Sequence, residues 1–504
     1  MAASKEQKQY SAEQIMKLFS EKKSDFWVEE GRKRSLALFH EAAQRVPAYK
    51  DFLKKNHVDP KKVKTWDDFQ QQVPIMSKKN YLRQYPLEKL CWDGSLNKPL
   101  VFTATSGSTG EPFYFCRQQQ LDWQSSIIHE IFLQNSSYGA KKSTLVIVGF
   151  GMGVWIGGLI TYKAFEIAAQ RGKYPVSIIT TGINKKEIFR ALKMLAPKYE
   201  QTIIVGYPPF IKDLVDEAGD HNIDFKKLHT RFLFAAEPFT EKFRDYLAKH
   251  AGIKNVYTDT LSVYGSADIG TMAYETTISI LIKRLALKNK SLFKDLFSLA
   301  NKVPTLTQYN PLDIDFEEDG GEVFLTGDSA IPLARYAIGD HGGILSFNEV
   351  KTKLKKHGIN LEKEARGVGI KKIYELPFVY IYERNDSATT IYGLLIYPEI
   401  IREALLNESP SKFLTGKFIM ETKFDKKQDQ FLEINLEMRK DKKTSTALKR
   451  NAEKKIFDAL REKSSEFKEL SNFLGKRARP KLLFWPAEHP AYFKPGVKQK
   501  WVKK

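Results

Sequence analysis

The sequence predicts a two-domain α/β protein, and three observations support this prediction. The chain has 504 residues, which is three to four times the length of a typical domain. Between about residues 100 and 340, short apolar strands alternate with amphipathic helices, as they do in βαβ units. After residue 386 a smaller pattern of strands and helices begins. We therefore expect a large domain of mixed β-sheets and helices, followed by a small α+β domain.

The first hundred residues are expected to be mainly helical. Ser11 is a suitable cap for a helix over 11–20, because Glu13 and Gln14 follow it closely. Residues 33–46 carry apolar side chains at helical spacing, which predicts a second helix. We expect a helical lead-in over about 1–95.

Strands and helices are then expected in alternation. Runs rich in apolar residues predict strands at 100–104, 112–116, 143–148, 177–180, 202–205 and 231–235, with helices at 185–195 and 241–250. In the last part of the chain, strands at 417–424 and 431–438 flank a polar turn, and a helix over 446–470 precedes a strand at 480–485.

The charge of the chain is strongly positive. Its 81 Lys and Arg residues exceed its 60 Asp and Glu residues, giving a net charge of +21. Residues 387–504 hold 26 of the basic and 15 of the acidic residues, a surplus of 11. A basic chain suits polyanions, but no zinc finger, RNA-recognition signature or pattern of basic and aromatic residues is present. We expect a lysine-rich solvated surface and no nucleic-acid partner.

Neither a membrane span nor a disulfide framework is predicted. Residues 143–162 carry no charge, but five glycines among them favour a strand, a glycine-rich loop and a helix starting near Trp155. The polar N-terminus has no signal-peptide core. Cys91 and Cys116 are the only cysteines, so a reducing, cytoplasmic location is expected.

A loop rich in hydroxyl groups is the strongest local sign of phosphate binding. It lies between two predicted strands, and its glycines and hydroxyl side chains allow several N–H and O–H donors to converge on one anion. The residues of this loop are Thr105, Ser106, Gly107, Ser108, Thr109 and Gly110. The Gly-Lys-Ser/Thr ending of a Walker loop is absent.

This loop, followed by Pro112, resembles the signature of the acyl-adenylate-forming superfamily. Within that superfamily the chain is most similar to the phenylacetate–CoA ligase group and its capsule-biosynthesis homologues. Further family motifs follow in order. These are Ala236-Glu237-Pro238, Tyr264-Gly265-Ser266-Ala267-Asp268, the segment 331–340 ending in Asp340, and Arg384-Asn385-Asp386.

The resemblance implies roles for these residues. It places Ala236, Glu237 and Pro238 against adenine, and Tyr264 nearby. Gly265, Ser266 and Ala267 belong to the same AMP-binding motif, in which the hydroxyl residue touches the α-phosphate. It gives Asp340 the two ribose hydroxyls and places Arg384 among the AMP-binding residues. Asp268 would help to hold Mg²⁺, which prefers carboxylates and phosphate oxygens.

The resemblance also implies a moving C-terminal domain. Residues 1–383 would form the large domain, 384–386 the hinge, with Asp386 as its pivot, and 387–504 the small mobile domain. Near the end of the chain, Gly496 is followed by Lys498 and Lys500. One of these would be the catalytic lysine of adenylation, and Lys498 is favoured because it follows the glycine more closely.

The resemblance also implies an acyl pocket after the glycine-containing strand and around a Tyr-Pro-Pro turn. Its candidate residues are Phe150, Trp155, Tyr207 and Ile211. The identity of the acid, whether aryl, fatty or another, does not follow from these residues.

Several features depart from the family pattern. Glu111 and Glu383 stand where relatives carry a lysine and a glycine, and Asp268 is one methylene shorter than the usual glutamate. The segment 277–311 is a basic insertion, expected as a helix packed on the body, with a membrane-surface helix as the alternative. The role of the lysine-rich segment 345–376 stays open.

The resemblance therefore implies a ligase that uses ATP and Mg²⁺ to convert a small carboxylic acid into an acyl-adenylate. Coenzyme A is the expected acceptor of the acyl group. The alternatives are transfer to an acyl-carrier protein, an amine or a protein cysteine, or a degenerate homologue that only binds nucleotide. Whether the protein forms a homodimer is left open.

Overall fold

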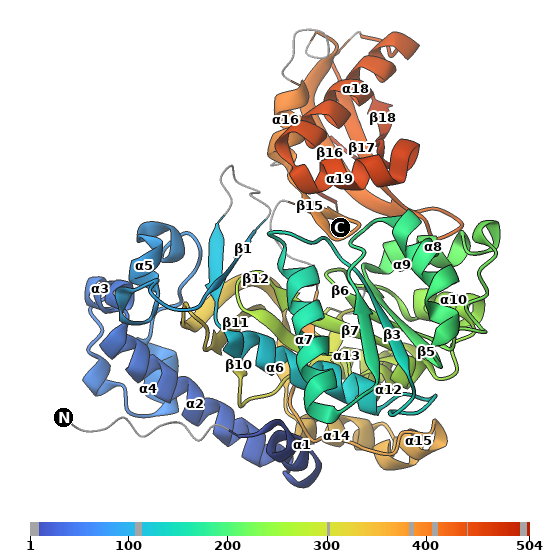
Figure 1. Cartoon of the computed structure of the whole chain (residues 1–504). Coiled ribbons are helices and arrows are strands. Elements are labelled where there is room, and N and C mark those ends of the chain that lie inside the picture. The colour runs from blue at the N-terminus through green and yellow to red at the C-terminus, as the bar shows by residue number, and fades with distance from the viewer. Residues whose placement is uncertain are drawn as a thin grey trace.

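The computed structural model describes residues 10–105, 113–299, 303–382, 388–405, 412–440, 442–493 and 501–503. Within these ranges it has the predicted α/β architecture (Figure 1). One large mixed sheet contains most of the strands. The C-terminal elements form smaller sheets of their own at one end of the molecule.

The N-terminal region is helical, as predicted. Its helices are α1 (Ala12–Glu21), α2 (Ser24–Arg45), α3 (Pro47–Lys55), α4 (Trp66–Gln72) and α5 (Leu87–Leu90). Ser11 caps α1 as expected: its hydroxyl accepts a hydrogen bond from the Gln14 amide, and the Gln14 side chain accepts one from the Ser11 amide. The second helix begins nine residues before the predicted range, at Ser24.

The large sheet has eleven strands among the described residues, and its order is not the order of the chain. From one edge to the other it contains β10 (Ile314–Asp319), β11 (Glu322–Gly327), β12 (Leu333–Leu345), β13 (Phe378–Ile381), β9 (Thr305–Gln308), β8 (Gly270–Tyr274), β7 (Thr260–Ser266), β6 (Thr230–Ala235), β5 (Gln201–Gly206), β3 (Thr144–Gly149) and β4 (Val176–Ile179). Strands β4, β3, β5, β6 and β7 are parallel, and the others pair antiparallel.

Helices cover the large sheet. They are α6 (Gln119–Gln134), α7 (Ile156–Gly172), α8 (Lys185–Met194), α9 (Pro208–Asp216), α10 (Glu241–Ala251), α11 (Val256–Asp259), α12 (Thr277–Lys288), α13 (Lys290–Leu296), α14 (Phe347–Lys356) and α15 (Leu361–Gly367). Strand β3 is entirely buried, as a parallel strand covered on both faces should be. A separate hairpin joins β1 (Val101–Ala104) to β2 (Tyr114–Arg117).

The basic insertion packs on the body, as predicted. Ile278, Leu281 and Ile282 of α12 are buried in an apolar cluster shared with α13, α14 and α15. Lys283 is also buried, and its ammonium lies 2.8 Å from carboxylate oxygens of Glu241 and Glu275. No helix of the described ranges is long and apolar enough to cross a membrane.

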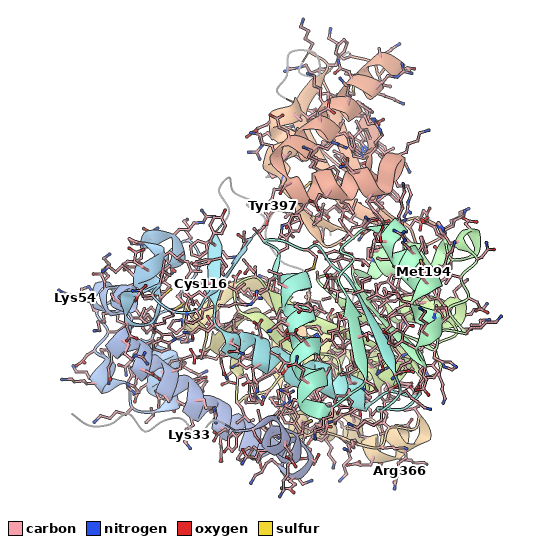
Figure 2. All side chains as sticks on the ribbon, viewed as in Figure 1. Lys33, Lys54, Cys116, Met194, Arg366 and Tyr397 are labelled. Carbon is pink, nitrogen blue, oxygen red and sulfur yellow. The ribbon has the colours of Figure 1, made fainter. Side chains whose placement is uncertain are left out.

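The C-terminal elements are a short hairpin and a three-stranded sheet with helices. They comprise β14 (Thr389–Ile391), β15 (Leu394–Ile396), α16 (Pro398–Leu405), β16 (Leu414–Phe424), β17 (Gln430–Met438), α18 (Thr446–Lys463), α19 (Ser465–Leu474), the short 3₁₀ helix Gly475–Ala478 and β18 (Lys481–Trp485). Tyr397, just after β15, lies where these elements meet the large sheet (Figure 2).

One predicted helix is wrong as a single element. The range 446–470 is divided at Ser464, whose backbone is extended. The Ser464 hydroxyl accepts a hydrogen bond from the Phe467 amide and so caps a new helix, α19. A serine between two amphipathic runs ends one helix and starts the next, which a continuous apolar pattern conceals.

A buried ion pair fastens the junction of β6 and β7. Arg231 of β6 and Asp259 at the end of α11 are both fully buried, and Arg231 Nε lies 2.9 Å from Asp259 Oδ1. The Arg231 guanidinium also donates to the carbonyls of Phe132 and Thr258. Because a lone buried charge is costly, each partner depends on the other.

We predict that Asp259→Asn lowers the free energy of unfolding by about 3–5 kcal/mol, because it leaves Arg231 without a counter-charge. Urea unfolding followed by circular dichroism measures the loss. The control is Lys351→Gln, which breaks a half-exposed ion pair with Glu362 and should cost about 0–1 kcal/mol. Equal losses in the two variants would contradict this account.

Candidate active site

The carboxyl ends of the parallel strands lie side by side at one edge of the sheet. The register pairs Gly149 of β3 with Gly206 of β5, and Ala235 of β6 with Val263 of β7. The next residues of each strand therefore leave the sheet at the same edge. In sheets of this kind, ligands bind beyond the carboxyl ends of the strands.

Three predicted site segments leave this edge. Phe150 follows β3, Tyr207 follows β5, and the segment Ala236, Glu237 and Pro238 follows β6. Tyr264 lies near the end of β7. The structure thus brings together predicted acyl-pocket and adenine residues that are 29 to 114 positions apart in the sequence.

The described part of the phosphate loop is its base. Thr105 closes the β1–β2 hairpin: its amide donates to the Phe113 carbonyl, and its hydroxyl accepts from the Phe113 amide at 3.2 Å. The Ala104 amide donates to the carbonyl of Val154, in the segment after β3. The base of the loop is therefore attached to the glycine-rich segment beside the acyl-pocket residues.

The turn after β6 has an uncommon backbone conformation. Ala236 has a φ of 74°, an uncommon conformation for a residue with a side chain. Ala236 and Pro238 are exposed, whereas the Glu237 side chain is buried. The Glu237 carboxylate accepts hydrogen bonds from the Gly393 amide and from Gln430 Nε2. Glu237 therefore joins this turn to the C-terminal elements.

Tyr264 and Asp340 meet directly. The Tyr264 hydroxyl donates to Asp340 Oδ2, and the Asp340 side chain is almost completely buried in β12. Gly339, just before it, has a φ of 87°, a conformation that glycine adopts without strain. Two motifs that are 76 residues apart thus contribute to one polar cluster.

The rest of the Tyr264 motif forms a tight turn between β7 and β8. Gly265 approaches the partner strand closely, because a Cβ there would lie 2.8 Å from the Gly270 carbonyl oxygen. The Asp268 amide donates to the Ser266 hydroxyl at 3.2 Å, and Ala267 is half-buried in the same turn.

Asp268 is the only predicted metal ligand, and its carboxylate is already engaged. Tyr336 donates to Oδ2 at 2.6 Å, and the Lys78 ammonium lies 3.0 Å from Oδ1. Within the described ranges there is no group of three or more His, Cys, Asp or Glu side chains suited to a metal. One carboxylate suffices only where phosphate and water supply the other ligands of Mg²⁺. Asp268 therefore fits a Mg²⁺ ion that is bound mainly by the phosphate oxygens of a nucleotide.

The predicted acyl residues lie close together, though they do not all line the same space. Trp155 and Tyr207 line a cavity of about 20 Å³, which is little more than one water molecule needs. Phe150 packs edge-on against Tyr207, with ring centroids 5.0 Å apart. Ile211 is fully buried in the adjoining core and is not among the residues that line the cavity.

The C-terminal elements close this cavity. Its remaining lining residues are Gly151, Ile183, Phe210, Tyr392, Leu394, Glu466, Glu469 and Leu470. Burial and, to a smaller extent, the neighbouring charge of Glu469 raise the pKa of Glu466 to about 7, and a hydrogen bond with Trp155 opposes this shift. A carboxyl with this pKa is partly protonated at neutral pH.

Several predicted residues lie outside the described ranges. They are Ser106, Gly107, Ser108, Thr109 and Gly110 of the phosphate loop, Glu111, Glu383, Arg384, Asp386, and the two lysines Lys498 and Lys500. Their roles stay predictions.

Sequence reasoning missed three contributors to the site. Tyr336 lies inside the motif segment 331–340, so its hydroxyl could have been recognised as a hydrogen-bond donor to the site. Lys78 reaches Asp268 from a loop 190 residues earlier, and no local pattern marks it. Glu466 sits in the first turn of α19, where an acidic residue is ordinary.

Comparison with known proteins supports the fold. No family model matches the sequence, and no curated protein matches it. Among solved structures, the chain is similar to a 2-hydroxyisobutyryl-CoA ligase bound to its acyl-AMP and CoA in the thioesterification state. The TM-score is 0.64 at 15% identity, with 97% of this chain and 91% of that chain covered.

The same ligase is matched in two other arrangements. In its postadenylation state the TM-score is 0.54, with 97% and 90% of the two chains covered. In an open conformation it is 0.50, with 94% and 91% covered. Identity is 15% in both. The chain therefore has the fold of this CoA ligase over nearly its whole length, which confirms the predicted resemblance at the level of fold.

We predict that the protein becomes less stable relative to its Glu466→Gln variant as the pH rises from 4.5 to about 7. The folded protein holds the Glu466 proton more tightly than the unfolded chain, whose carboxyl has a pKa near 4.5. Stability from this proton is complete below the unfolded pKa and is lost as pH passes the folded one. The expected change is on the order of 3 kcal/mol.

Urea unfolding at a series of pH values measures this difference. The control is Glu462→Gln, at an exposed position of α18, which should leave the pH profile of the wild type unchanged. If Glu466→Gln and the wild type follow parallel profiles, the carboxyl does not have a raised pKa.

Proposed function

We propose that this protein uses ATP to activate a carboxylic acid as an acyl-adenylate, releasing pyrophosphate, and then passes the acyl group to an acceptor. The observation that carries the proposal is the meeting of four motifs at one sheet edge: the base of the Thr105 loop, the Glu237 turn, Tyr264 and Asp340. Their order in the sequence and their convergence in space both fit an adenylate site. The 2-hydroxyisobutyryl-CoA ligase structures, in which an acyl-AMP is bound, give further support.

The residues have distinct parts in nucleotide binding. The exposed turn of Ala236 and Pro238, with the Tyr264 ring, would face adenine. The Asp340 carboxylate can accept hydrogen bonds from both ribose hydroxyls, and the Tyr264 hydroxyl that now donates to it keeps it oriented. The hydroxyl groups of the loop that starts at Thr105, and Ser266, would donate to phosphate oxygens.

The acid must be activated before its acyl group can be transferred, because a free carboxylate is a poor electrophile. Attack of its oxygen on the α-phosphorus of ATP breaks the bond to pyrophosphate and creates a mixed anhydride with AMP as a good leaving group. Two anions must approach each other in this step. A lysine from the C-terminal segment, Lys498 or Lys500, would stabilise the developing charge.

Asp268 is the residue that would hold Mg²⁺. The positive charge of this ion would offset the negative charge of the phosphates. Its carboxylate is buried and hydrogen-bonded by Tyr336, which fixes its orientation. Lys78, on the other oxygen, adds a cation at the same place.

We take coenzyme A as the leading acceptor and place the protein nearest the phenylacetate–CoA ligase group. We call the cavity lined by Trp155 and Tyr207 the acyl cavity; Tyr392 and Leu394 close it from the C-terminal side. This supports an acceptor that arrives between the two proposed domains, residues 1–383 and 387–504. The hinge between them would be residues 384–386. An acyl-carrier protein or an amine would enter by the same path. Formation of acyl-CoA from free coenzyme A separates the first acceptor from the others.

We predict acid-dependent exchange of labelled pyrophosphate into ATP for at least one member of a panel of aryl, fatty and amino acids. Asp340→Ala should raise the ATP concentration needed for half-maximal exchange by about 10–100-fold, as expected for lost hydrogen bonds to a charged group. Asp319→Ala, at an exposed position, is the control. Folded protein that exchanges with no acid on the panel would refute the proposal.

We predict that Lys498→Ala slows adenylation by about 10²–10³-fold, as removal of a transition-state donor does, with little change in ATP binding. Single-turnover formation of the adenylate measures the rate. Lys503→Ala, which alters an exposed lysine of the same tail, should leave it unchanged. If Lys498→Ala is as fast as the wild type, the role passes to Lys500.

A further inference from the structure

A set of charged residues crosses the junction between the C-terminal elements and the large sheet. On the large side lie Asp213 and Lys212, which are adjacent in α9, and both side chains are buried. On the C-terminal side lie Arg477, in the 3₁₀ helix after α19, and Asp429, in the turn before β17. Residues 264 positions apart thus meet at this junction.

The pairing is specific at the level of atoms. Both terminal nitrogens of Arg477 lie 3.0 Å from Asp213 Oδ1. The Lys212 ammonium lies 2.8 Å from Asp429 Oδ1 and 2.5 Å from Asp216 Oδ2. Each side therefore contributes one cation and one anion. In one pair the cation, Lys212, belongs to the large side, and in the other pair the cation, Arg477, belongs to the C-terminal side.

Asp213 needs this partner. Its side chain is 2% exposed, whereas that of Arg477 is 37% exposed. A buried carboxylate without a compensating charge is costly. Lys185 also lies near it, but at 3.6 Å, so Arg477 makes the closer contact. Moving the C-terminal elements away would remove the Arg477 guanidinium from Asp213.

The same charges hold a hairpin against the acyl cavity. Arg477 donates to the Tyr392 hydroxyl at 2.5 Å, and Tyr392 lies in the turn between β14 and β15. The next residue, Gly393, donates to Glu237, and a Cβ on Gly393 would lie 2.4 Å from the Tyr207 ring. Arg477 thus secures the turn that closes the cavity next to the predicted acyl residues.

Residues 501–503 lie elsewhere on the C-terminal unit, by which we mean the elements from β14 to β18 and these three residues. Trp501 packs on Phe418 with ring centroids 4.8 Å apart, and its carbonyl accepts from the Met420 amide at 2.8 Å. Met420 lies in the middle of β16, whereas the turn that contacts Lys212 follows the end of that strand. In this arrangement Tyr392 of the β14–β15 turn lines the acyl cavity, whereas residues 501–503 do not.

We propose that Asp213 and Arg477 are positioning residues that hold the C-terminal unit in the arrangement used for acyl transfer, and not in the one used for adenylation. This assignment rests on the proposed two-step function. The ion pair acts through the Tyr392–Gly393 turn, which it keeps against Tyr207 and Glu237. Loosening the pair therefore affects the second step and leaves the first intact.

The test measures the two steps separately in the full-length protein. Arg477→Gln and Asp213→Asn should each slow transfer of the acyl group from preformed adenylate to coenzyme A by about tenfold, and pyrophosphate exchange should stay within twofold of the wild type. The double variant should be no slower than either single variant, because the two residues act as one unit. Arg479→Gln is the matched control, since Arg479 pairs at 2.9 Å with Glu453 inside the C-terminal unit.

Equal losses in both steps, or a similar effect of Arg479→Gln, would overturn the assignment. A second measurement does not depend on activity: small-angle X-ray scattering of the protein without ligands. Arg477→Gln should increase the radius of gyration, whereas Arg479→Gln should not. If the wild type shows no pyrophosphate exchange, the proposed function fails, and an unchanged radius of gyration in Arg477→Gln would separately refute the positioning role.

Discussion

The hydrogen-bond register of four parallel strands determines where the candidate active site of this protein lies. Because Gly149 pairs with Gly206, and Ala235 with Val263, the segments that follow β3, β5, β6 and β7 leave the sheet together. A shift of register would separate the predicted acyl-pocket residues from the turn expected to face adenine. The buried Arg231–Asp259 pair and the fully covered strands protect this register, so the stability of the sheet and the geometry of the site have the same origin.

Glu237 links the site to the motion that the proposed function requires. Its backbone belongs to the turn expected to face adenine, while its buried carboxylate binds Gly393 and Gln430 of the C-terminal elements. Docking of those elements therefore changes the hydrogen bonds of the turn that is expected to face adenine. The surplus of positive charge in residues 387–504 gains a partial explanation here, since Arg477 meets a buried carboxylate. Most of those lysines nevertheless remain on the solvated surface.

Local sequence patterns predicted most of the fold, and motif order predicted which segments meet. Alternation of apolar runs located β3, β5 and β6 to within two residues, because buried parallel strands leave a continuous apolar signal. It failed at Ser464, where one hydroxyl divides a helix. Contacts such as Lys78 with Asp268, or Asp213 with Arg477, could not be predicted, because they depend on tertiary folding that brings distant, individually ordinary charges together.

The most direct test of the account is the crystal structure of the full-length protein with AMP. The account predicts the adenine against the exposed turn of Ala236 and Pro238 and beside Tyr264, and the ribose hydroxyls within hydrogen-bond distance of the Asp340 carboxylate. AMP bound elsewhere, or an Asp340 that makes no contact with a well-ordered ribose, would contradict the assignment of this sheet edge as an adenylate site.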